Sequence, residues 1–335
     1  MSGTDKKSFI LAGDIGGTKT KLGLFTSGKK RPALKYMNSY QSGNFDNLEK
    51  IIDIFLSEVK VRPDAACFGV AGPVKNGCCR TTNLPWNISG KKIEKTFQLN
   101  RAFLINDLTA MASSVPFLTG REVTGINNVR SFKKGNISVI APGTGLGQAL
   151  LVYSRGRYIP VPSEGGHTDF APKNELETGL LRHLAQKYGH VSIERILSGP
   201  GLYNIYEYLV SGGICKAPAW LVKRIKEGDP AKIINDSARE KGQRLCLKTI
   251  DIFISILGAA AGNLALTGMT TGGVFLGGGI PPRILWRLKQ GMFLDSFVEK
   301  GRFRGIMEKI PVKVILNDDA ALLGAAIAGL KDMEE

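Results

Sequence analysis

The feature that most constrains this chain is an apolar segment that ends in a glycine turn and is followed at once by a second apolar segment. One copy spans residues 9–25 and turns at Gly16-Gly17-Thr18, and another spans residues 137–153 and turns at Gly143-Thr144-Gly145. Strands joined by so few residues pair as antiparallel hairpins. The repeat therefore predicts an α/β protein with two related lobes that face one nucleotide.

Each glycine turn has the composition of a phosphate site. Glycine tolerates positive φ and lets backbone N–H groups approach an anion closely, and the threonine hydroxyl adds a donor. In the first copy Asp14 precedes the turn, and its carboxylate suits a hydrated Mg²⁺. An ordinary tight hairpin with Asp14 as a turn cap is the favoured alternative for one copy alone. The second copy shifts the balance towards phosphate binding.

Two familiar phosphate loops do not match these turns. A P-loop needs Gly-Lys-Ser/Thr at the start of a helix, whereas Thr18-Lys19-Thr20 is followed here by an amphipathic strand. A dinucleotide fingerprint needs a helix after its glycines, and the segment after Gly147 is rich in β-formers. Both readings are therefore disfavoured.

Composition excludes several classes of protein. With 335 residues, 43% hydrophobic and 22% charged, the chain is long enough for two cores and too apolar for disorder. The net charge of +16 attracts polyanions and steers anions such as ATP. The basic residues are scattered, lack interleaved aromatics and form no DNA-binding module, which favours a solvated basic surface and no specific nucleic acid.

The cysteines and the hydropathy of the sequence indicate the cellular compartment and whether the chain crosses a membrane. The five cysteines form no C-x-x-C pair, which supports neither a zinc site nor a disulfide framework and favours a reducing, cytoplasmic compartment. The polar start, residues 1–8, leads directly into the first strand without a signal sequence. The apolar stretch from Ile250 to Gly268 is interrupted by Asp251, Asn263 and glycines, so we expect a buried helix and no membrane span.

Hydrophobic periodicity places the remaining elements. The pattern predicts strands over 65–70, 102–105 and 272–276, helices over 47–60, 108–114, 175–188, 192–197, 201–209 and 230–268, a final helix over 318–330, and a hinge near 116–120.

Polar residues follow two of the predicted strands. Asn106-Asp107 comes directly after a strand, where α/β sheets place ligands and catalytic groups, but both residues are also favoured helix N-caps. The sequence alone favours neither the catalytic nor the helix-cap interpretation. The glycines at 277–279 follow another strand and offer a flat platform for a ligand such as adenine.

A further carboxylate and an imidazole share one short segment. The two glycines in Glu164-Gly165-Gly166-His167 let both side chains project into one cavity, where hydrogen bonds to a polyol fit better than a tetrahedral zinc set. A surface loop is the alternative for this segment alone. Glu194 is equally well explained as a capping acid paired with Arg195.

Taken in order, these segments resemble the bacterial-type glucokinases of the hexokinase, actin and heat-shock-protein superfamily. The matching stretches are Gly13 to Thr18, Ala71-Gly72-Pro73-Val74, Thr82-Asn83-Leu84-Pro85-Trp86, Ile105 to Leu108, Pro142 to Gly147, Glu164 to His167, Glu194 to Gly201 and Gly277 to Ile280. Each motif alone is modestly specific, whereas their order along essentially the whole chain is highly specific.

The resemblance implies a two-domain ribonuclease H-like/actin-like ATPase fold with an interdomain cleft. It implies a small α/β domain of residues 1–117 plus 316–335 and a large α+β domain of residues 118–315. The implied activity is ATP-dependent phosphorylation of D-glucose at the C6 hydroxyl, the first step of glycolysis, with Mg²⁺ and a homodimeric enzyme.

The resemblance also implies roles for individual residues. Asp107 would be the general base and would bind the sugar together with Asn106, Glu164, His167 and Glu194. Asp14 would orient Mg²⁺ through water. Phosphates would lie against Gly16, Gly17, Thr18, Gly143, Thr144 and Gly145, and the adenosine against Gly278 and Gly279.

Two other functions stay open at this point. A related hexose such as mannose, fructose, glucosamine or N-acetylmannosamine could replace glucose, because one or two loop contacts decide between them. A sugar-responsive regulator is a hypothesis from another class, prompted by the +16 charge. No helix-turn-helix precedes the first hairpin, and Asp107 is present although a sensor needs no base.

Overall fold

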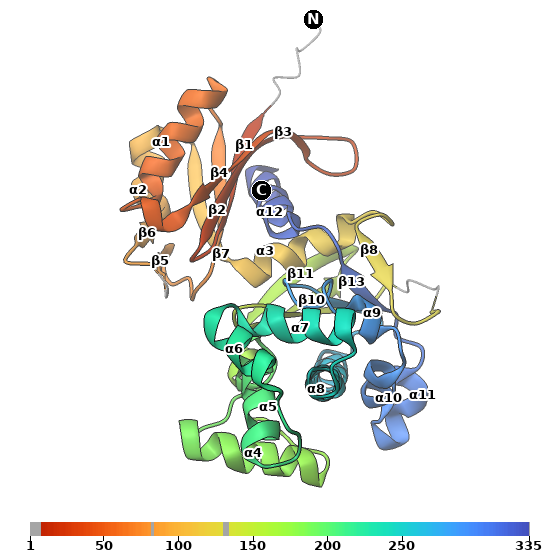
Figure 1. Cartoon of the computed structure of the whole chain (residues 1–335). Helices are drawn as coiled ribbons and strands as arrows, with labels where there is room; N and C mark the ends of the chain where they lie inside the picture. The colour runs from red at the N-terminus through yellow and green to blue at the C-terminus, as the bar shows by residue number, and fades with distance from the viewer. Residues whose placement is uncertain (1–7, 82–83, 130–133, 335) are drawn as a thin grey trace, which may run out of the picture. The chain divides into compact units, whose positions relative to one another are not determined.

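The computed structural model describes residues 8–81, 84–129 and 134–334 (Figure 1). It separates into two compact units, of which unit 1 comprises Met1–Thr119, Tyr158–Pro162 and Asn317–Glu335, and unit 2 comprises Gly120–Arg157 and Ser163–Leu316. Thr82 and Asn83, part of one matching stretch, lie outside the described residues. The domain boundaries predicted from the sequence, at 117/118 and 315/316, stay a prediction.

Unit 1 combines one main sheet with four α-helices. Its elements are β1 (Phe9–Ile15), β2 (Lys19–Thr26), β3 (Ala33–Gln41), η1 (Ser42–Asn44), α1 (Leu48–Val59), β4 (Ala65–Val70), β5 (Cys78–Arg80), β6 (Asn87–Ser89), α2 (Gly90–Phe97), β7 (Arg101–Asn106), α3 (Asp107–Ser114), η2 (Val115–Phe117) and α12 (Ala320–Glu334).

The remaining elements follow between η2 and α12. They are β8 (Val123–Gly125), β9 (Ile137–Pro142), β10 (Leu146–Ser154), β11 (Arg157–Ser163), η3 (Gly165–His167), α4 (Glu175–Tyr188), η4 (Ile193–Arg195), α5 (Gly199–Ser211), α6 (Ala219–Glu227), α7 (Pro230–Lys241), α8 (Arg244–Gly268), β12 (Gly273–Leu276), α9 (Leu285–Leu288), α10 (Met292–Val298), η5 (Gly301–Phe303), α11 (Arg304–Met307) and β13 (Val312–Ile315).

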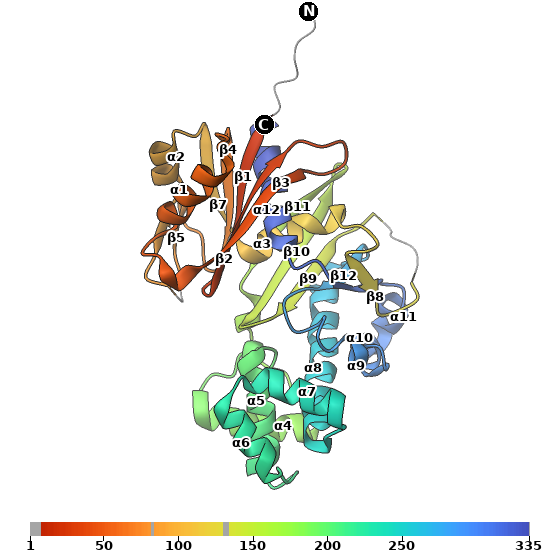
Figure 2. The ribbon, with the colours of Figure 1, turned by 45° about the horizontal axis from the view of Figure 1, so that its top comes forward.

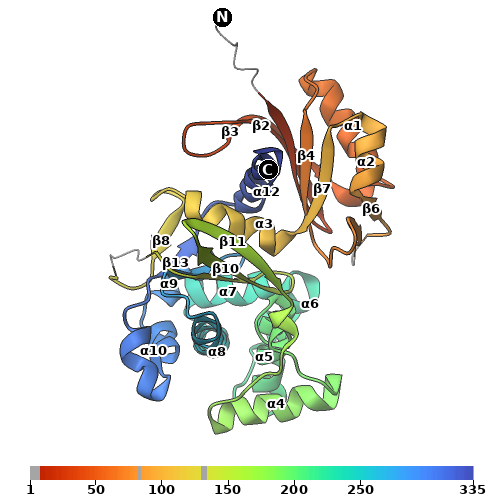
Figure 3. The same ribbon diagram turned by 180° about the vertical axis from the view of Figure 1, so that it is seen from behind.

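The sheet of unit 1 is covered by helices on both faces (Figures 1 and 3). Alternate residues of a strand point to opposite faces. Accordingly Leu11 and Ile15 of β1 pack in the cluster that contains α1 and Ile93 of α2, whereas Ile10 and Ala12 pack against α12. Strands buried on both faces need apolar residues throughout, which is why β4 is buried along its whole length.

The two main sheets repeat one topology. Unit 1 has the strand order β3-β2-β1-β4-β7, and the second sheet has β11-β10-β9-β12-β13, extended by β8 (Figure 2). In both, the glycine-turn hairpin is antiparallel, and its first strand pairs in parallel with the strand that follows two strands further along the chain after the hairpin, β4 for β1 and β12 for β9. The predicted duplication of a glycine-turn hairpin is confirmed.

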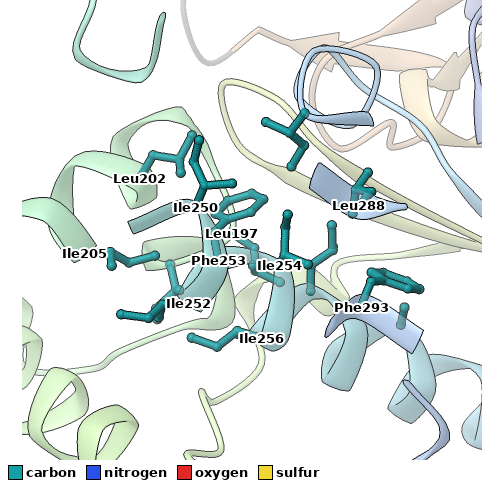
Figure 4. Close-up of a cluster of buried hydrophobic side chains, with 14 of the residues drawn as sticks. Leu197, Leu202, Ile205, Ile250, Ile252, Phe253, Ile254, Ile256, Leu288 and Phe293 are labelled. Atoms are coloured by element: carbon teal, nitrogen blue, oxygen red, sulfur yellow. The ribbon is translucent and has the colours of Figure 1, made fainter. Parts of the chain in front are cut away.

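Helix α8 forms the centre of the unit 2 core. Ile250, Phe253 and Ile254 on this helix are buried among residues such as Leu202, Ile205 and Phe293 (Figure 4). Within the described chain, α8 is the one helix long and apolar enough to cross a membrane, and 72% of its apolar window is buried in the structure. That burial agrees with the expected core helix.

Several predicted helix bounds differ from the structure. Residues 192–197 form only the short η4, and the helix expected over 230–268 is two helices, α7 and α8. Gly242 separates them because its φ of 58° lies in the left-handed region and ends α7. The final helix begins at Ala320, after the Asn317 side chain accepts a bond from the Asp319 N–H at 2.8 Å.

Helices α3 and α12 approach each other closely in unit 1. At Gly324 of α12, an added Cβ would lie 1.6 Å from the carbonyl oxygen of Ala110 in α3. Only glycine permits this backbone contact. The packing fixes α3, whose first residue is Asp107.

Candidate active site

The first glycine turn joins β1 to β2 and is held by Ser42. The Gly16 N–H donates to the Lys19 carbonyl at 3.0 Å, and the buried Ser42 donates its N–H to Thr18 O (2.9 Å) and its hydroxyl to Gly16 O (2.8 Å). Gly16 does not adopt the left-handed region. A Cβ at this position would lie 3.0 Å from Lys19 O, which is tighter than an ordinary contact, so glycine suits the turn through close approach of the backbone.

Asp14 lies one residue before the end of β1 in a charged neighbourhood. It pairs with Lys21 across the hairpin and with Gly69 on β4. Burial, and next the negative charge of Asp107, raise its pKa to about 6, although Lys21 acts in the opposite direction. Lys21 is itself held by Asp319 at 2.6 Å and by the Asp318 carbonyl at 3.0 Å. Asp14 near the end of β1 and Asp107 directly after β7 lie on the two strands that flank β4, and their negative charges disfavour each other.

This raised pKa predicts a pH-dependent stability difference. The unfolded chain loses the Asp14 proton near 3.8 and the folded chain near 6, so the free energy of unfolding falls as pH rises between these values. Asp14→Asn removes the charge, and we expect it to stabilise the protein by up to about 3 kcal/mol above pH 7. The advantage should fade as pH drops towards 4.

Denaturant unfolding of both proteins at several pH values, without nucleotide, measures this difference. The midpoint gap should widen from pH 4 to pH 7 and then stay constant. A gap that is absent, or that has the opposite sign at pH 7, would show that Asp14 carries no unfavourable charge in the folded state.

Asn106 and Asp107 lie where β7 ends and α3 begins. The Asn106 side chain accepts bonds from the N–H groups of Leu108 (2.9 Å) and Thr109 (3.3 Å) and donates to Gly72 O at 3.4 Å. Oδ1 of Asp107 also accepts from Leu108 N–H at 2.8 Å. The helix-cap interpretation is thus confirmed for Asn106, and it leaves the catalytic prediction for Asp107 untested.

The second glycine turn is held by Glu194. Oε2 of Glu194 accepts a bond from the Leu146 N–H at 2.7 Å, directly after Gly145. Within the described residues no ion pair joins Glu194 to Arg195, whose guanidinium instead lies 4.2 Å from the ring centre of Tyr188. The capping-pair alternative for Glu194 is therefore wrong.

The adenosine candidates lie beside the same turn. Gly278 has φ +78°, and a Cβ there would lie 2.5 Å from Pro142 O, so a larger residue fits neither the conformation nor the space. Ile280 N–H donates to the same carbonyl at 3.3 Å. The residues Gly143, Thr144 and Gly279 line one cavity of about 640 Å³ within unit 2.

Residues that sequence analysis did not single out complete this cavity. Its wall also contains Lys187, Tyr188, Tyr203 and Arg283, and the first residues of α5 and of α7. Ser198 caps α5 and is followed by a proline, a start signal that could have been recognised in the sequence. Lys187 and Tyr188 at the end of α4, and Arg283 before α9, carry no such local signal.

The Glu164–His167 segment packs against the start of β10. A Cβ at Gly166 would lie 2.0 Å from Leu146 O, and one at Gly165 would lie 2.4 Å from Oε1 of Gln148. Gly166 is therefore required by its backbone contact, whereas a side chain at Gly165 would have to displace the Gln148 side chain. The side chains of Glu164 and His167 are exposed, which is compatible with the predicted sugar contact and with the surface-loop alternative, so the predicted roles stay a prediction.

The structure thus gathers the predicted residues into two sets. Asp14, the first turn, Asn106 and Asp107 belong to unit 1, whereas the second turn, Glu164, His167, Glu194, Gly278 and Gly279 belong to unit 2. Within each set the residues converge on the ends of neighbouring strands. That is where α/β sheets bind ligands.

Comparison with known proteins identifies the family to which this chain is similar. The glucokinase family model matches residues 11–332. The glucokinase of Nostoc punctiforme is 36% identical over 339 residues, covering 97% of this chain and 99% of that protein. The crystal structure of a glucokinase from an Antarctic psychrotroph superimposes with a TM-score of 0.86 at 33% identity, covering 97% and 99% of the two chains.

A more distant structure supports the fold. The ROK family glucokinase from Streptomyces griseus, solved in complex with glucose and AMPPNP, gives a TM-score of 0.61 at 20% identity and covers 97% of this chain. The predicted α/β fold of the ribonuclease H-like/actin-like ATPase type is confirmed by these structures. With a family match over nearly its whole length, the chain belongs to the glucokinase family.

Proposed function

We propose that this protein transfers the γ-phosphoryl group of ATP to the C6 hydroxyl of D-glucose and so catalyses the first step of glycolysis. The observation that carries the proposal is the family match over residues 11–332. Glucose and an ATP analogue are bound together in the Streptomyces griseus relative.

The cavity of about 640 Å³ in unit 2 supports ATP as the phosphoryl donor. Helix N-termini attract phosphate, and α5 and α7 both begin at its wall. Lys187 and Arg283 add positive charge, and Tyr188 and Tyr203 add aromatic surface. In the proposal, Gly143, Thr144 and Gly145 contact phosphate, and Gly278 and Gly279 flank the adenosine. Gly16, Gly17 and Thr18 contact phosphate from unit 1.

Asp14 suits a magnesium ion held through water. Its oxygen ligand is of the type that Mg²⁺ prefers, and a nearby cation would favour the charged form that burial and Asp107 disfavour. When bound, Mg²⁺ neutralises charge on the transferring phosphates. Asp14 thus fits the metal that such a kinase needs.

Asp107 performs the proton chemistry in the proposed mechanism. Its carboxylate accepts the proton of the C6 hydroxyl as that oxygen attacks the γ-phosphorus in line, and ADP leaves. Asn106, Glu164, His167 and Glu194 hydrogen-bond the other hydroxyls, which fixes the C6 oxygen and discriminates against other sugars. The helix-start bond from Leu108 N–H to Asp107 Oδ1 keeps the base oriented.

We further propose a cytoplasmic homodimer without a specific nucleic-acid or membrane partner. Scattered basic residues and the resemblance support these points. The division into a small domain of residues 1–117 plus 316–335 and a large domain of residues 118–315 is part of the same proposal.

An ADP-release assay with MgATP and a panel of hexoses tests the function. We expect glucose to give the highest kcat/KM, with at least about tenfold discrimination against fructose, mannose and N-acetylmannosamine. Preferential turnover of another hexose would change the proposed substrate but leave the proposed kinase activity in place. No sugar-dependent ADP release with any hexose would contradict the kinase and favour a sugar-responsive regulator, which sugar binding without turnover would support.

A further inference from the structure

The two carboxylate oxygens of Glu194 have different surroundings. Oε2 accepts the Leu146 N–H at 2.7 Å, whereas Oε1 accepts no hydrogen bond from any other described residue. Leu146 is the first residue of β10, directly after the second glycine turn. One oxygen thus holds the turn, and the other remains available to a hydroxyl donor.

Gly145 shows how tightly the carboxylate packs on the turn. The three atoms nearest to a Cβ built at Gly145 all belong to Glu194, namely Oε2 at 2.5 Å, Cδ at 3.3 Å and Oε1 at 3.9 Å. The φ of Gly145 is not left-handed. A side chain at this position would therefore displace the Glu194 carboxylate from the turn, whereas the backbone conformation itself does not demand glycine.

The chain segment that carries Glu194 also holds the other end of the turn. Ser198 donates its hydroxyl to the Glu194 carbonyl at 2.8 Å, and the Gly199 N–H donates to the Gly143 carbonyl at 2.8 Å. Gly143 and Thr144 line the cavity assigned to ATP. The Glu194 contact and the Gly199 contact therefore fix the turn from both sides.

We infer that Glu194 is a positioning residue for the nucleotide, because its carboxylate fixes the conformation of the phosphate-binding turn before any sugar is present. The inference rests on the proposed function for the identity of the nucleotide site. It goes beyond that function, because a pure sugar ligand would not influence nucleotide affinity in the absence of sugar. A sugar hydroxyl that donates a hydrogen bond to Oε1 of Glu194 would then link sugar binding to the same turn.

Titration calorimetry with MgADP and no sugar tests the inference. We expect Glu194→Ala to weaken MgADP binding about tenfold or more, because a charge-assisted bond to the turn is lost. Glu194→Gln retains an acceptor for Leu146 N–H and should stay within about threefold of the wild type. Glu240→Ala is the matched control, since this exposed carboxylate on α7 has no proposed role in binding, and its MgADP affinity should be unchanged.

A double-mutant cycle with Gly145 provides the second test. Gly145→Ala alone should displace the carboxylate and weaken MgADP binding about as much as Glu194→Ala. In the Glu194→Ala background the clashing atoms are gone, so Gly145→Ala should have little further effect. Independent, additive losses would overturn the inference.

Hydrogen exchange of the ligand-free proteins separates this inference from the proposed function. Exchange in residues 143–147 should accelerate in Glu194→Ala and much less in Glu194→Gln. If wild-type protein binds no MgADP, the proposed function fails and the exchange result alone decides whether Glu194 holds the turn. Unchanged exchange, or unchanged MgADP affinity in a folded Glu194→Ala variant of a nucleotide-binding protein, would overturn the inference.

Discussion

Asp107→Asn is expected to lower kcat for glucose phosphorylation by about 10²–10⁴-fold, with glucose affinity retained within a few fold. The amide cannot accept the proton of the C6 hydroxyl, but it has nearly the same shape as the carboxylate. Its Oδ1 can still accept the Leu108 N–H that Asp107 accepts at 2.8 Å. Helix α3 should therefore start as it does in the wild type, and steady-state kinetics together with glucose titration would separate base loss from binding loss.

Asp64→Asn is the matched control for this substitution. Asp64 is also a unit 1 carboxylate that accepts a backbone N–H, that of Phe9 at 2.8 Å. It has no proposed role in the reaction, so Asp64→Asn should leave kcat within a few fold. If Asp107→Asn keeps more than about a tenth of the wild-type kcat, proton transfer to this residue does not limit the reaction.

Gly324→Ala is expected to destabilise unit 1 by more than about 3 kcal/mol. The added methyl group would lie 1.6 Å from the Ala110 carbonyl oxygen and 2.6 Å from the carbon of that carbonyl. These are backbone atoms, so the strain cannot be relieved by rotating a side chain, and α12 must move away from α3. Because α3 begins with Asp107, we also expect a large loss of activity in whatever fraction remains folded.

Fluorescence of the buried Trp86 can report on unit 1 in a background with Trp220→Phe and Trp286→Phe. Urea unfolding should show a lower midpoint for Gly324→Ala than for the parent. The control is Gly43→Ala in η1 of unit 1, where an added Cβ has no neighbour within 4 Å, and this variant should be unchanged or slightly more stable. A Gly324→Ala midpoint equal to the parent's would mean that the two helices separate at little cost.

Local sequence patterns were sufficient for most elements of the fold. The all-apolar β4 and the amphipathic α1 follow from periodicity alone, although Asn47, predicted as the first helical residue, is the N-cap of α1. Ile54 belongs to the apolar pattern of α1 but is 39% exposed. The buried face of a helix is narrower than the set of apolar residues in its sequence. Only the packing against the sheet decides which of those residues are buried.

The candidate site was predictable as a set of residues but not as a set of contacts. The order of the motifs identified Asp14 and Asp107, whereas their mutual repulsion depends on β1 and β7 lying on either side of β4. Glu194 was assigned through resemblance, and its bond to Leu146 joins residues 48 positions apart. No local pattern encodes contacts of this range.

Helix α12 also determines the order in which the protein can fold during synthesis. Together with Ala110 of α3, it supplies the residues that cover Ile10, Ala12 and Cys67 on one face of the first sheet. Most of that face therefore stays exposed during synthesis until residues near Ile327 have been made, whereas unit 2 ends at Leu316 and has its residues available earlier. One face of the first strands is thus among the last parts of the chain to be buried, and we expect it to be exposed to chaperones and to aggregation.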